Sequence, residues 1–213
     1  MSVSPPTLTA EQIRAAQNHG SATLHEAAGR IGALPSFIKP LVFTARLCGP
    51  AFTVHGRGHD NLWIHRAVYA ASAGDILVIA TGQALEAGYW GEILNEAAMA
   101  RHLGGLVIEG GVRDSVVLTA QPFPVFSAGL CIVGTGKDFG AKGWLNAAIR
   151  IGDTVIQPGD LICGDADGVV SIPKDRVDTV LKASVAREAD EAAKIARIRA
   201  GERTVDLYKF GME

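Results

Sequence analysis

Two short groups of residues, Gly91–Glu92 and Arg113–Asp114, have the chemistry needed to hold a small anion. An arginine binds a carboxylate through two parallel hydrogen bonds. Asp114 could hold a hard divalent cation, Mg²⁺ or Mn²⁺, whose remaining ligands are mostly water. Gly91 opens a predicted helix, and the unpaired amides and positive dipole end of a helix start also favour an anion. Together these groups would form a candidate binding site.

The two groups are 22 positions apart, but simple lengths predict that they meet in space. A helix from Gly91 to His102 climbs about 18 Å at ~1.5 Å per residue. After a turn at Gly104–Gly105, the extended run Leu106 to Gly111 returns about 20 Å at ~3.3 Å per residue. We therefore expect Arg113 and Asp114 to lie beside the start of the helix.

Each of these residues also has a purely structural interpretation. Asp114 could cap a short helix over 115–120, with Arg113 as a surface charge. Glu92 could simply complement the dipole of its helix. The returning strand favours a site at Arg113 and Asp114, while for Glu92 both interpretations stay open.

Composition indicates a single α/β domain over residues 1–213, with an abundance of glycine and a hydrophobic fraction of 48%. The net charge of −2 gives no reason to expect nucleic acid or a membrane surface as a partner. Cys48, Cys131 and Cys163 lack metal-binding spacing and are predicted to be buried, reduced thiols. Without a signal-like segment or a long apolar run, the chain is expected to be cytoplasmic.

Helices are predicted at both chain ends. After an irregular lead-in over 2–6, one helix begins near Thr9, and a second spans 20–32 with Ser21 or Thr23 as its cap. A third follows Asp60, its expected cap, over 61–72. A long helix over about 174–201 lies between Pro173 and Gly201. This arm is too long to pack only on its own domain, so we expect it to contact a neighbouring subunit.

The middle of the chain is rich in strands. They are predicted over 46–54, with an interruption at Gly49–Pro50, and over 75–80, 106–109, 124–129, 130–134, 146–155 and 160–172. Within the last, GDADGVV has the wrong spacing for a calcium loop and predicts a hairpin turn. The overall expectation is a layered α–β–β–α sandwich with helices outside.

The segments GYWGE and GGLVIEGGVRD resemble the signature of the HMG/CHA aldolase family, in which a glycine and an acidic residue precede Arg-Asp at a fixed interval. The similarity extends along essentially the whole chain, including GSATLHEAAGR, GDILVIA and PGDLICGDADGVVSIP. These aldolases cleave 4-hydroxy-4-methyl-2-oxoglutarate and 4-carboxy-4-hydroxy-2-oxoadipate. They share their fold with the regulators of ribonuclease activity A, and members form trimers or dimers of trimers.

Carried across position by position, the resemblance implies that Arg113 contacts the pyruvate-like part of the substrate and stabilises the enolate oxygen. Asp114 would be the direct protein ligand of Mg²⁺ or Mn²⁺. Glu92 occupies the acidic position that supports metal-bound water, where the aldolases more often have aspartate. Ser115 follows Arg-Asp where the family often has an acidic residue.

The resemblance also implies roles for backbone groups and for a second subunit. The amides of Ile93 and Leu94, directly after Gly91, would face the substrate carboxylate. A glutamate from a neighbouring subunit's C-terminal helix would complete the metal's outer shell. Glu191 is the best match for that position, and Glu188 is next.

The expected activity is a metal-dependent class II aldolase that cleaves a 4-hydroxy-2-keto diacid to pyruvate and a second keto acid, with oxaloacetate decarboxylation as a side activity. No Schiff-base lysine is needed, and Lys137 and Lys142 lie in a glycine-rich loop predicted to be exposed. The alternative is a non-catalytic protein that binds and regulates a ribonuclease on the same fold.

Overall fold

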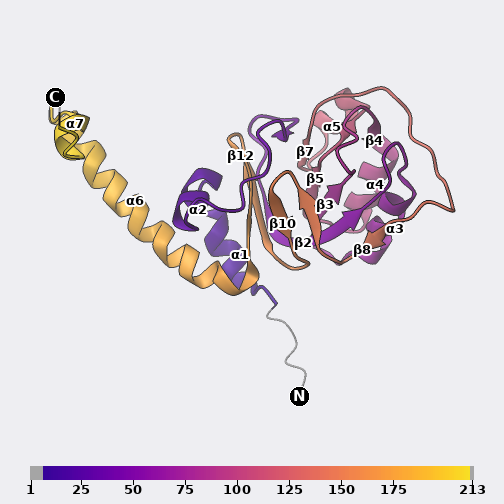
Figure 1. Ribbon diagram of the computed structural model, residues 1–213, viewed down its shortest axis with the longest axis horizontal. Helices are drawn as coiled ribbons and strands as arrows, with labels where there is room; N and C mark the ends of the chain where they lie inside the picture. Colours follow the sequence, from indigo (N-terminus) through magenta and orange to yellow (C-terminus); the bar gives the residue numbers. More distant parts are fainter. Residues whose placement is uncertain (1–6, 212–213) are drawn as a thin grey trace, which may run out of the picture.

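The computed structural model describes residues 7–211, so the predicted lead-in over 2–6 lies outside the described part of the chain. Helices gather at the two chain ends and between the strands (Figure 1). They are α1 (Ala10–Gln17), α2 (Ser21–Ala27), α3 (Leu62–Ala70), α4 (Glu92–Ala100), α5 (Ser115–Ala120), α6 (Val177–Arg199) and α7 (Thr204–Leu207), with a 3₁₀ turn η1 (Lys174–Arg176) before α6. No helix in this part of the chain is both long and apolar enough to cross a lipid bilayer.

Most strands belong to one mixed sheet of eight strands. It contains, in spatial order, β1 (Lys39–Pro40), β7 (Val125–Ser127), β5 (Gly105–Ile108), β3 (Ile76–Ala80), β2 (Leu47–His55), β11 (Leu161–Asp165) and β12 (Gly168–Ile172), and β8 (Trp144–Leu145) also pairs with β2. Two smaller sheets pair β4 (Gly88–Trp90) with β6 (Gly111–Val112), and β9 (Ile149–Ile151) with β10 (Thr154–Ile156).

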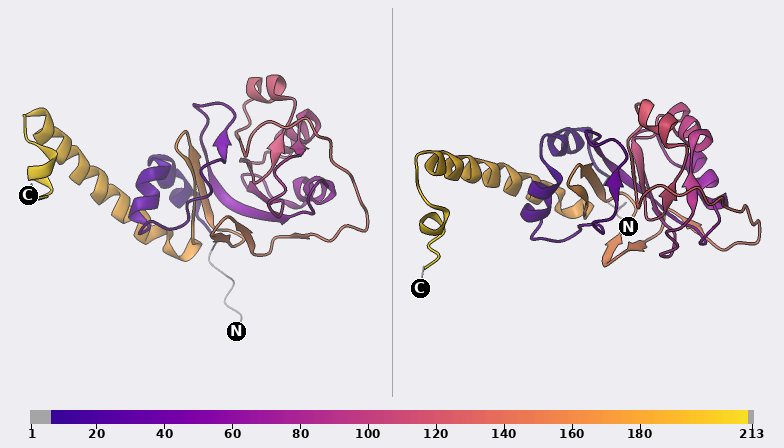
Figure 2. Two further views of the ribbon diagram at one scale, coloured as in Figure 1. Left: turned by 45° about the horizontal axis from the view of Figure 1, so that its top comes forward. Right: turned by 90° about the horizontal axis from the view of Figure 1, so that it is seen from above.

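The predicted α/β class and the helices at both ends are confirmed, but the strands do not stack as two layers. The large sheet curls instead, and its edge strands approach each other closely enough for Lys39 Nζ to donate to the Asp167 carbonyl at 2.6 Å. The result is nearly barrel-shaped. One side of the sheet packs under α3, α4 and α5, and α1, α2 and the start of α6 cover another part (Figures 1 and 2).

The central strands are buried as their continuous apolar composition predicts. Every residue of β3 is buried, and β5 is buried along its whole length. Their parallel pairing aligns Ile76 with Gly105 and Ile79 with Ile108. Because parallel strands covered on both faces lose all contact with water, they favour branched aliphatic side chains. This rigid pair carries α4 and the turn after β5 to the same edge of the sheet.

Four local predictions are wrong. The strand β2 runs unbroken through Gly49–Pro50, since both residues pair with β11, and β3 and β8 pair with β2 beyond them. Residues 130–134 form no strand and contribute a bridge from Leu130 to Val112. Residues 146–155 are not one strand, because β9 turns at Gly152 into β10.

The fourth error concerns α2, which spans Ser21–Ala27, is capped by Gly20 and ends before the predicted limit at residue 32. Ser21 does not act as the cap because its hydroxyl and its amide both donate to Asp165, at 2.6 and 2.7 Å. By contrast, Thr9 caps α1 through the amide of Gln12. The hairpin predicted at GDADGVV is confirmed as β11–β12.

Candidate active site

The start of α4 and the end of β6 lie side by side, as the length argument predicts. The short strands β4 and β6 pair in parallel, aligning Gly88 with Gly111 and Trp90 with Val112. One residue further on, the Arg113 amide donates to the Trp90 carbonyl at 2.8 Å. Backbone pairing therefore fixes Arg113 and Asp114 beside Gly91.

Gly91 is required at this junction for reasons of space. Its φ of −157° is ordinary extended backbone, so its conformation alone would suit any residue. A Cβ atom at this position would, however, lie 2.3 Å from Asp114 Oδ2 and 3.2 Å from Arg113 Cγ. The absence of a side chain lets the charged pair approach the start of the helix.

Asp114 adopts a left-handed backbone conformation, with φ of 59°. Aspartate tolerates this region better than most residues, although the conformation is strained. The turn directs the carboxylate away from α5 and toward α4, where Oδ2 accepts a hydrogen bond from the Glu92 amide at 3.0 Å. Asp114 precedes α5, but its side chain makes no capping bond to that helix. The structural interpretation of Asp114 as a side-chain cap of α5 is therefore wrong.

A cavity of about 130 Å³ lies beside this junction. Five of its lining residues belong to the predicted site: Gly91, Ile93, Leu94, Arg113 and Asp114. The others are Asn61, His65, Gly88, Tyr89 and Lys137. The Arg113 and Asp114 side chains are 48% and 42% exposed, with Arg113 Nε 3.9 Å from Asp114 Oδ2, so both remain available to a ligand.

The first turn of α4 offers two backbone donors to the cavity. The earliest intrahelical bond runs from the Asn95 amide to the Gly91 carbonyl. Within residues 7–211, the amides of Ile93 and Leu94 have no protein acceptor. Helix starts of this kind bind carboxylates and phosphates.

His65 and Lys137 add polar groups from two other elements. His65 is on α3, and Lys137 is in the loop between β7 and β8. Partial burial lowers the pKa of His65, and the nearby positive charge of Lys137 lowers it further. The imidazole is therefore neutral at pH 7.

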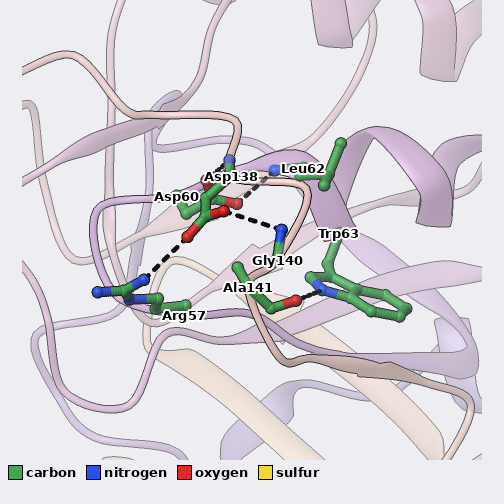
Figure 3. Close-up of polar contacts among 7 residues, drawn as sticks. All are labelled: Arg57, Asp60, Leu62, Trp63, Asp138, Gly140 and Ala141. Carbon is green, nitrogen blue, oxygen red and sulfur yellow. Dashed lines mark hydrogen bonds and ion pairs between the residues drawn. The ribbon is translucent and has the colours of Figure 1, made fainter.

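The loop that carries Lys137 is fastened to the start of α3 by the buried Asp60 carboxylate. Asp60 Oδ1 accepts from the Leu62 amide at 2.9 Å, and Oδ2 accepts from the Asp138 amide at 2.5 Å (Figure 3). The N-cap of α3 is Asn61 rather than the predicted Asp60, because the helix begins one residue later. The Asp60 carboxylate still accepts from the first amide of the helix, and it also anchors the loop. Further contacts between the two segments join Arg57 to Asp138 and Trp63 to Ala141.

The remaining predicted residues are not gathered in the cavity of this chain. Glu92 is exposed and contributes its amide rather than its carboxylate to the junction. Glu188 and Glu191 lie on α6, which extends away from α4 (Figure 1). Glu188 Oε1 contacts His19 Nδ1 at 2.8 Å, and Glu191 Oε1 contacts Arg187 Nη2 at 2.7 Å.

The donor set can be tested against a divalent metal. In residues 7–211, no cluster of three or more His, Cys, Asp or Glu side chains could enclose a metal ion. Asp114 alone supplies a carboxylate to the cavity, and the Glu92 amide lies beside it in space. Mg²⁺ often binds through one or two carboxylates and keeps several waters. The residues present therefore fit a hydrated Mg²⁺ or Mn²⁺ held by Asp114, and they do not fit a metal fully enclosed by one chain.

Sequence reasoning missed the contributions of Asn61, His65 and Lys137. The side-chain amide of Asn61 donates to the Tyr89 carbonyl at 3.0 Å, which joins α3 to the cavity wall. The one available signal was the adjacent loop GRGHDN, whose glycines are weak as a motif. Nothing in the sequence around Lys137 marks it as a site residue, because its position depends on the contact between Asp138 and Asp60, which are 78 residues apart.

The model of the RraA-like family, described as Aldolase/RraA, matches residues 17–171. The chain belongs to the Aldolase/RraA family. The matched region contains every residue that lines the cavity, whereas α6 lies beyond it.

Several curated relatives share this region. A Halalkalibacterium halodurans protein, provisionally named 4-hydroxy-4-methyl-2-oxoglutarate aldolase, is 39% identical over 162 residues, covering 76% of each chain. Burkholderia mallei proteins with the same provisional name are 32% identical over 144 residues, or 68% of this chain and 86% of theirs. Protein DlpA of Legionella pneumophila is 30% identical over 177 residues, and the chain spans only 28% of its length.

Solved structures share the fold of this Aldolase/RraA chain. A Pseudomonas syringae protein superimposes with a TM-score of 0.83 at 26% identity, covering 95% of this chain and 96% of that one. Streptomyces coelicolor RraAS2, described as an unusual member of the RNase ES inhibitor RraA family, has a TM-score of 0.77 at 20% identity, with 91% and 99% covered. At that identity the likeness concerns the fold alone.

Proposed function

We propose that this protein is a divalent-metal-dependent class II aldolase that cleaves a 4-hydroxy-2-keto diacid to pyruvate and a second keto acid. One observation carries the proposal: Arg113, Asp114 and the unpaired amides of Ile93 and Leu94 surround one cavity. A 2-keto acid has a carboxylate next to a carbonyl, and these groups supply matching donors. Curated relatives provisionally named 4-hydroxy-4-methyl-2-oxoglutarate aldolase support the same substrate class.

The cavity has a cation from each of two segments, which suits a substrate with two carboxylates. The amides at the start of α4 bind the carboxylate next to the keto group. Arg113 donates to the keto oxygen, where negative charge develops as the carbon–carbon bond breaks and the pyruvate enolate forms. Lys137, on the loop, attracts the second carboxylate. The neutral imidazole of His65 beside it can accept a hydrogen bond from a substrate hydroxyl.

Asp114 is the residue that would hold Mg²⁺ or Mn²⁺, and Glu92 would bind water of its outer shell. Such an ion, when bound, polarises the keto group and lowers the pKa of its bound water. Asp114 suits this role because the Glu92 amide fixes one of its oxygens in place. The turn at Asp114 leaves its second oxygen without that constraint.

The test is direct. Pyruvate release is measured from 4-hydroxy-4-methyl-2-oxoglutarate and from oxaloacetate with Mg²⁺ or Mn²⁺, and again after EDTA. We expect release with metal, loss with EDTA and restoration when metal is returned. Arg113→Ala should remove activity, because the charge on the enolate oxygen loses its donor. Arg101→Ala, at the exposed far end of α4, is the matched control. Unchanged turnover in Arg113→Ala would refute the role of Arg113.

We also propose that the active form is a trimer or a dimer of trimers, with the arm of one subunit reaching the site of another. Ile93, which lines the cavity, is 78% exposed, and Ile132, in the segment whose Val133 carbonyl accepts from the Gly88 amide, is 92% exposed. Single exposed apolar residues are ordinary, but several around a site indicate a covered surface. Glu191 is too remote to act in its own chain, so it would serve a neighbouring subunit, with Glu188 as the next choice.

Subunit mixing tests this arrangement. Arg113→Ala removes a group that a subunit contributes to its own site, whereas Glu191→Ala removes a group that it contributes to a neighbour's site. A mixed oligomer therefore contains some intact sites. We expect the two inactive variants to regain part of the activity after they are unfolded together and refolded. If Glu191→Ala alone retains full activity, the same experiment with Glu188→Ala distinguishes the two glutamates. No recovery in either mixture, together with a monomeric mass, would refute a shared site.

The alternative function, a non-catalytic regulator that binds a ribonuclease, uses the same fold. The similarity to RraA structures at 20 and 23% identity supports only that fold. A cavity lined by Arg113, Asp114 and Lys137 favours catalysis, because masking another protein requires a surface rather than a small charged cavity. Absence of pyruvate with every 4-hydroxy-2-keto diacid and metal tried would favour the regulator.

A further inference from the structure

Two cysteines far apart in sequence lie opposite each other on neighbouring strands. In the antiparallel pair of β2 and β11, Cys48 is aligned with Cys163, and their sulfur atoms are 3.2 Å apart. The proposed aldolase chemistry uses neither residue, since both line a different cavity of about 240 Å³. This second cavity lies beneath α1 and the start of α2 and also contains Arg46, His19 and Asp165.

The position in the ladder suits a covalent bond between the strands. Pro50, two residues after Cys48, is aligned with Leu161 and has no N–H to exchange. Pairs in an antiparallel ladder alternate between bonded and non-bonded, so Cys48 and Cys163 form a non-bonded pair like Pro50 and Leu161. In such pairs the Cα atoms are about 4.5 Å apart and the side chains are closest, within the range that a disulfide spans.

The two thiols differ in a way that assigns them different roles. Cys48 is half-buried, whereas Cys163 is buried. A hydrogen bond from Cys163 lowers the pKa of Cys48, and the guanidinium of Arg46 lowers it further against the effect of burial. The same contact and its own burial raise the pKa of Cys163. Cys48 is therefore the group that becomes a thiolate and reacts first.

We propose that Cys48 and Cys163 are a redox modification site, a dithiol that hydroperoxides convert reversibly to a disulfide between β2 and β11. The cavity admits a molecule as small as hydrogen peroxide to the more accessible sulfur. Arg46 stands beside that sulfur and stabilises the hydroxide that leaves. A dithiol reductant restores the original pair.

The reaction balances in two steps. The Cys48 thiolate attacks one peroxide oxygen, the O–O bond breaks, and sulfenic acid and hydroxide form. The Cys163 thiol then loses its proton, its sulfur displaces the hydroxyl group from Cys48, and water leaves. Two thiols and one peroxide thus give one disulfide and two waters. The second step is aided because oxidation of Cys48 removes the neighbouring thiolate that held the Cys163 proton.

Peptide mapping of the folded full-length chain tests the proposal. Trypsin places the three cysteines in separate peptides, 47–57, 114–137 and 151–174. After a stoichiometric amount of hydrogen peroxide, we expect 47–57 and 151–174 to be joined, and dithiothreitol to separate them. Cys131→Ser, the matched control, should form the same product. Cys48→Ser should form none, and Cys163→Ser should leave Cys48 as a sulfenic acid that dimedone captures.

Alkylation of the wild-type chain gives a measurement that needs no variant. Limiting iodoacetamide should modify Cys48 before Cys163, because the thiolate is the nucleophile. Either of two results would overturn the proposal: Cys48 oxidised to sulfinic acid while Cys163 stays a free thiol, or a joined peptide that forms in urea but not in the folded chain. Equal thermal midpoints for the serine variants and wild type would exclude misfolding as the cause of a negative result.

Discussion

Replacing Gly91 with alanine tests the geometry of the proposed active site with the smallest possible change. The added Cβ would lie 2.3 Å from Asp114 Oδ2, whereas ordinary contacts begin at 3.4 Å. The Asp114 carboxylate must therefore move by about 1 Å, because the competing atom belongs to the rigid start of α4. That movement breaks the hydrogen bond from the Glu92 amide.

The size of the effect follows from the bond that is lost. A hydrogen bond to a charged group contributes roughly 1.5–3 kcal/mol, and the lower end applies here because Asp114 is 42% exposed. A misplacement of about 1 Å at a reacting centre can cost on the order of 100-fold in rate. We expect Gly91→Ala to lower kcat/KM for pyruvate release by about 10- to 100-fold and to lower stability by only about 1.5 kcal/mol.

The assay is metal-dependent pyruvate release, coupled to NADH oxidation by lactate dehydrogenase, with thermal unfolding measured in parallel. Gly134→Ala is the matched control, because a Cβ at Gly134 meets nothing within 4 Å. It should retain wild-type activity. If Gly91→Ala turns over normally while Arg113→Ala is inactive, the position of the Asp114 carboxylate has no bearing on catalysis. That outcome would refute the assignment of Asp114 but leave the enzyme itself intact.

Three further predictions concern groups around the cavity. Asp60→Ala leaves two amides without their acceptor, which costs about 1–3 kcal/mol each, so it should lower the unfolding free energy by at least about 2 kcal/mol. The released loop should also be cleaved faster by trypsin after Lys137, and an unchanged cleavage rate would contradict the anchoring role. Lys137→Met should raise KM for 4-hydroxy-2-keto diacids about 10-fold or more while leaving kcat within about threefold, whereas equal KM values would exclude contact with the second carboxylate. The pKa of His65 is lower in the folded chain than in the unfolded one, so between that lowered pKa and about 6.5 the unfolded chain binds more protons and stability falls as pH falls. Thermal midpoints at pH 8 and pH 5.5 should therefore differ less in His65→Asn than in wild type, and identical differences would show that His65 does not titrate in this way.

The part of the site that the sequence predicted depends on local geometry. The rise of a helix and of a strand are nearly constant, so the return of Arg113 and Asp114 to Gly91 follows from counting residues. The close approach of Asp114 to Gly91 follows from the same count of residues. The αL turn that points the Asp114 side chain back to α4 was not predictable, because aspartate also occurs widely as an ordinary helix cap.

The parts that were missed depend on contacts between distant segments. Lys137 reaches the cavity through the bond from its neighbour Asp138 to Asp60, and no periodicity encodes that pairing. Residues 130–134 are as apolar as a strand, but their backbone meets β6 at only one bridge. Ser21 has the right type for a helix cap, yet Asp165 competes for both its hydroxyl and its amide. In each case a tertiary partner decided between local alternatives.

The arm formed by α6 has a consequence for how the protein folds. Its 23 residues extend about 34 Å at ~1.5 Å per residue, but its buried residues are Val177, Val180 and Ser184, all near its beginning. Within the described residues, no part of α6 beyond Ser184 is buried, and isolated helical segments of ~12–15 residues are marginal in water. If the arm packs on a neighbouring subunit as we propose, a newly made polypeptide would complete the last turns of α6 only when a second copy arrives. Dilution alone should unwind the arm, while the β-sheet beneath stays intact.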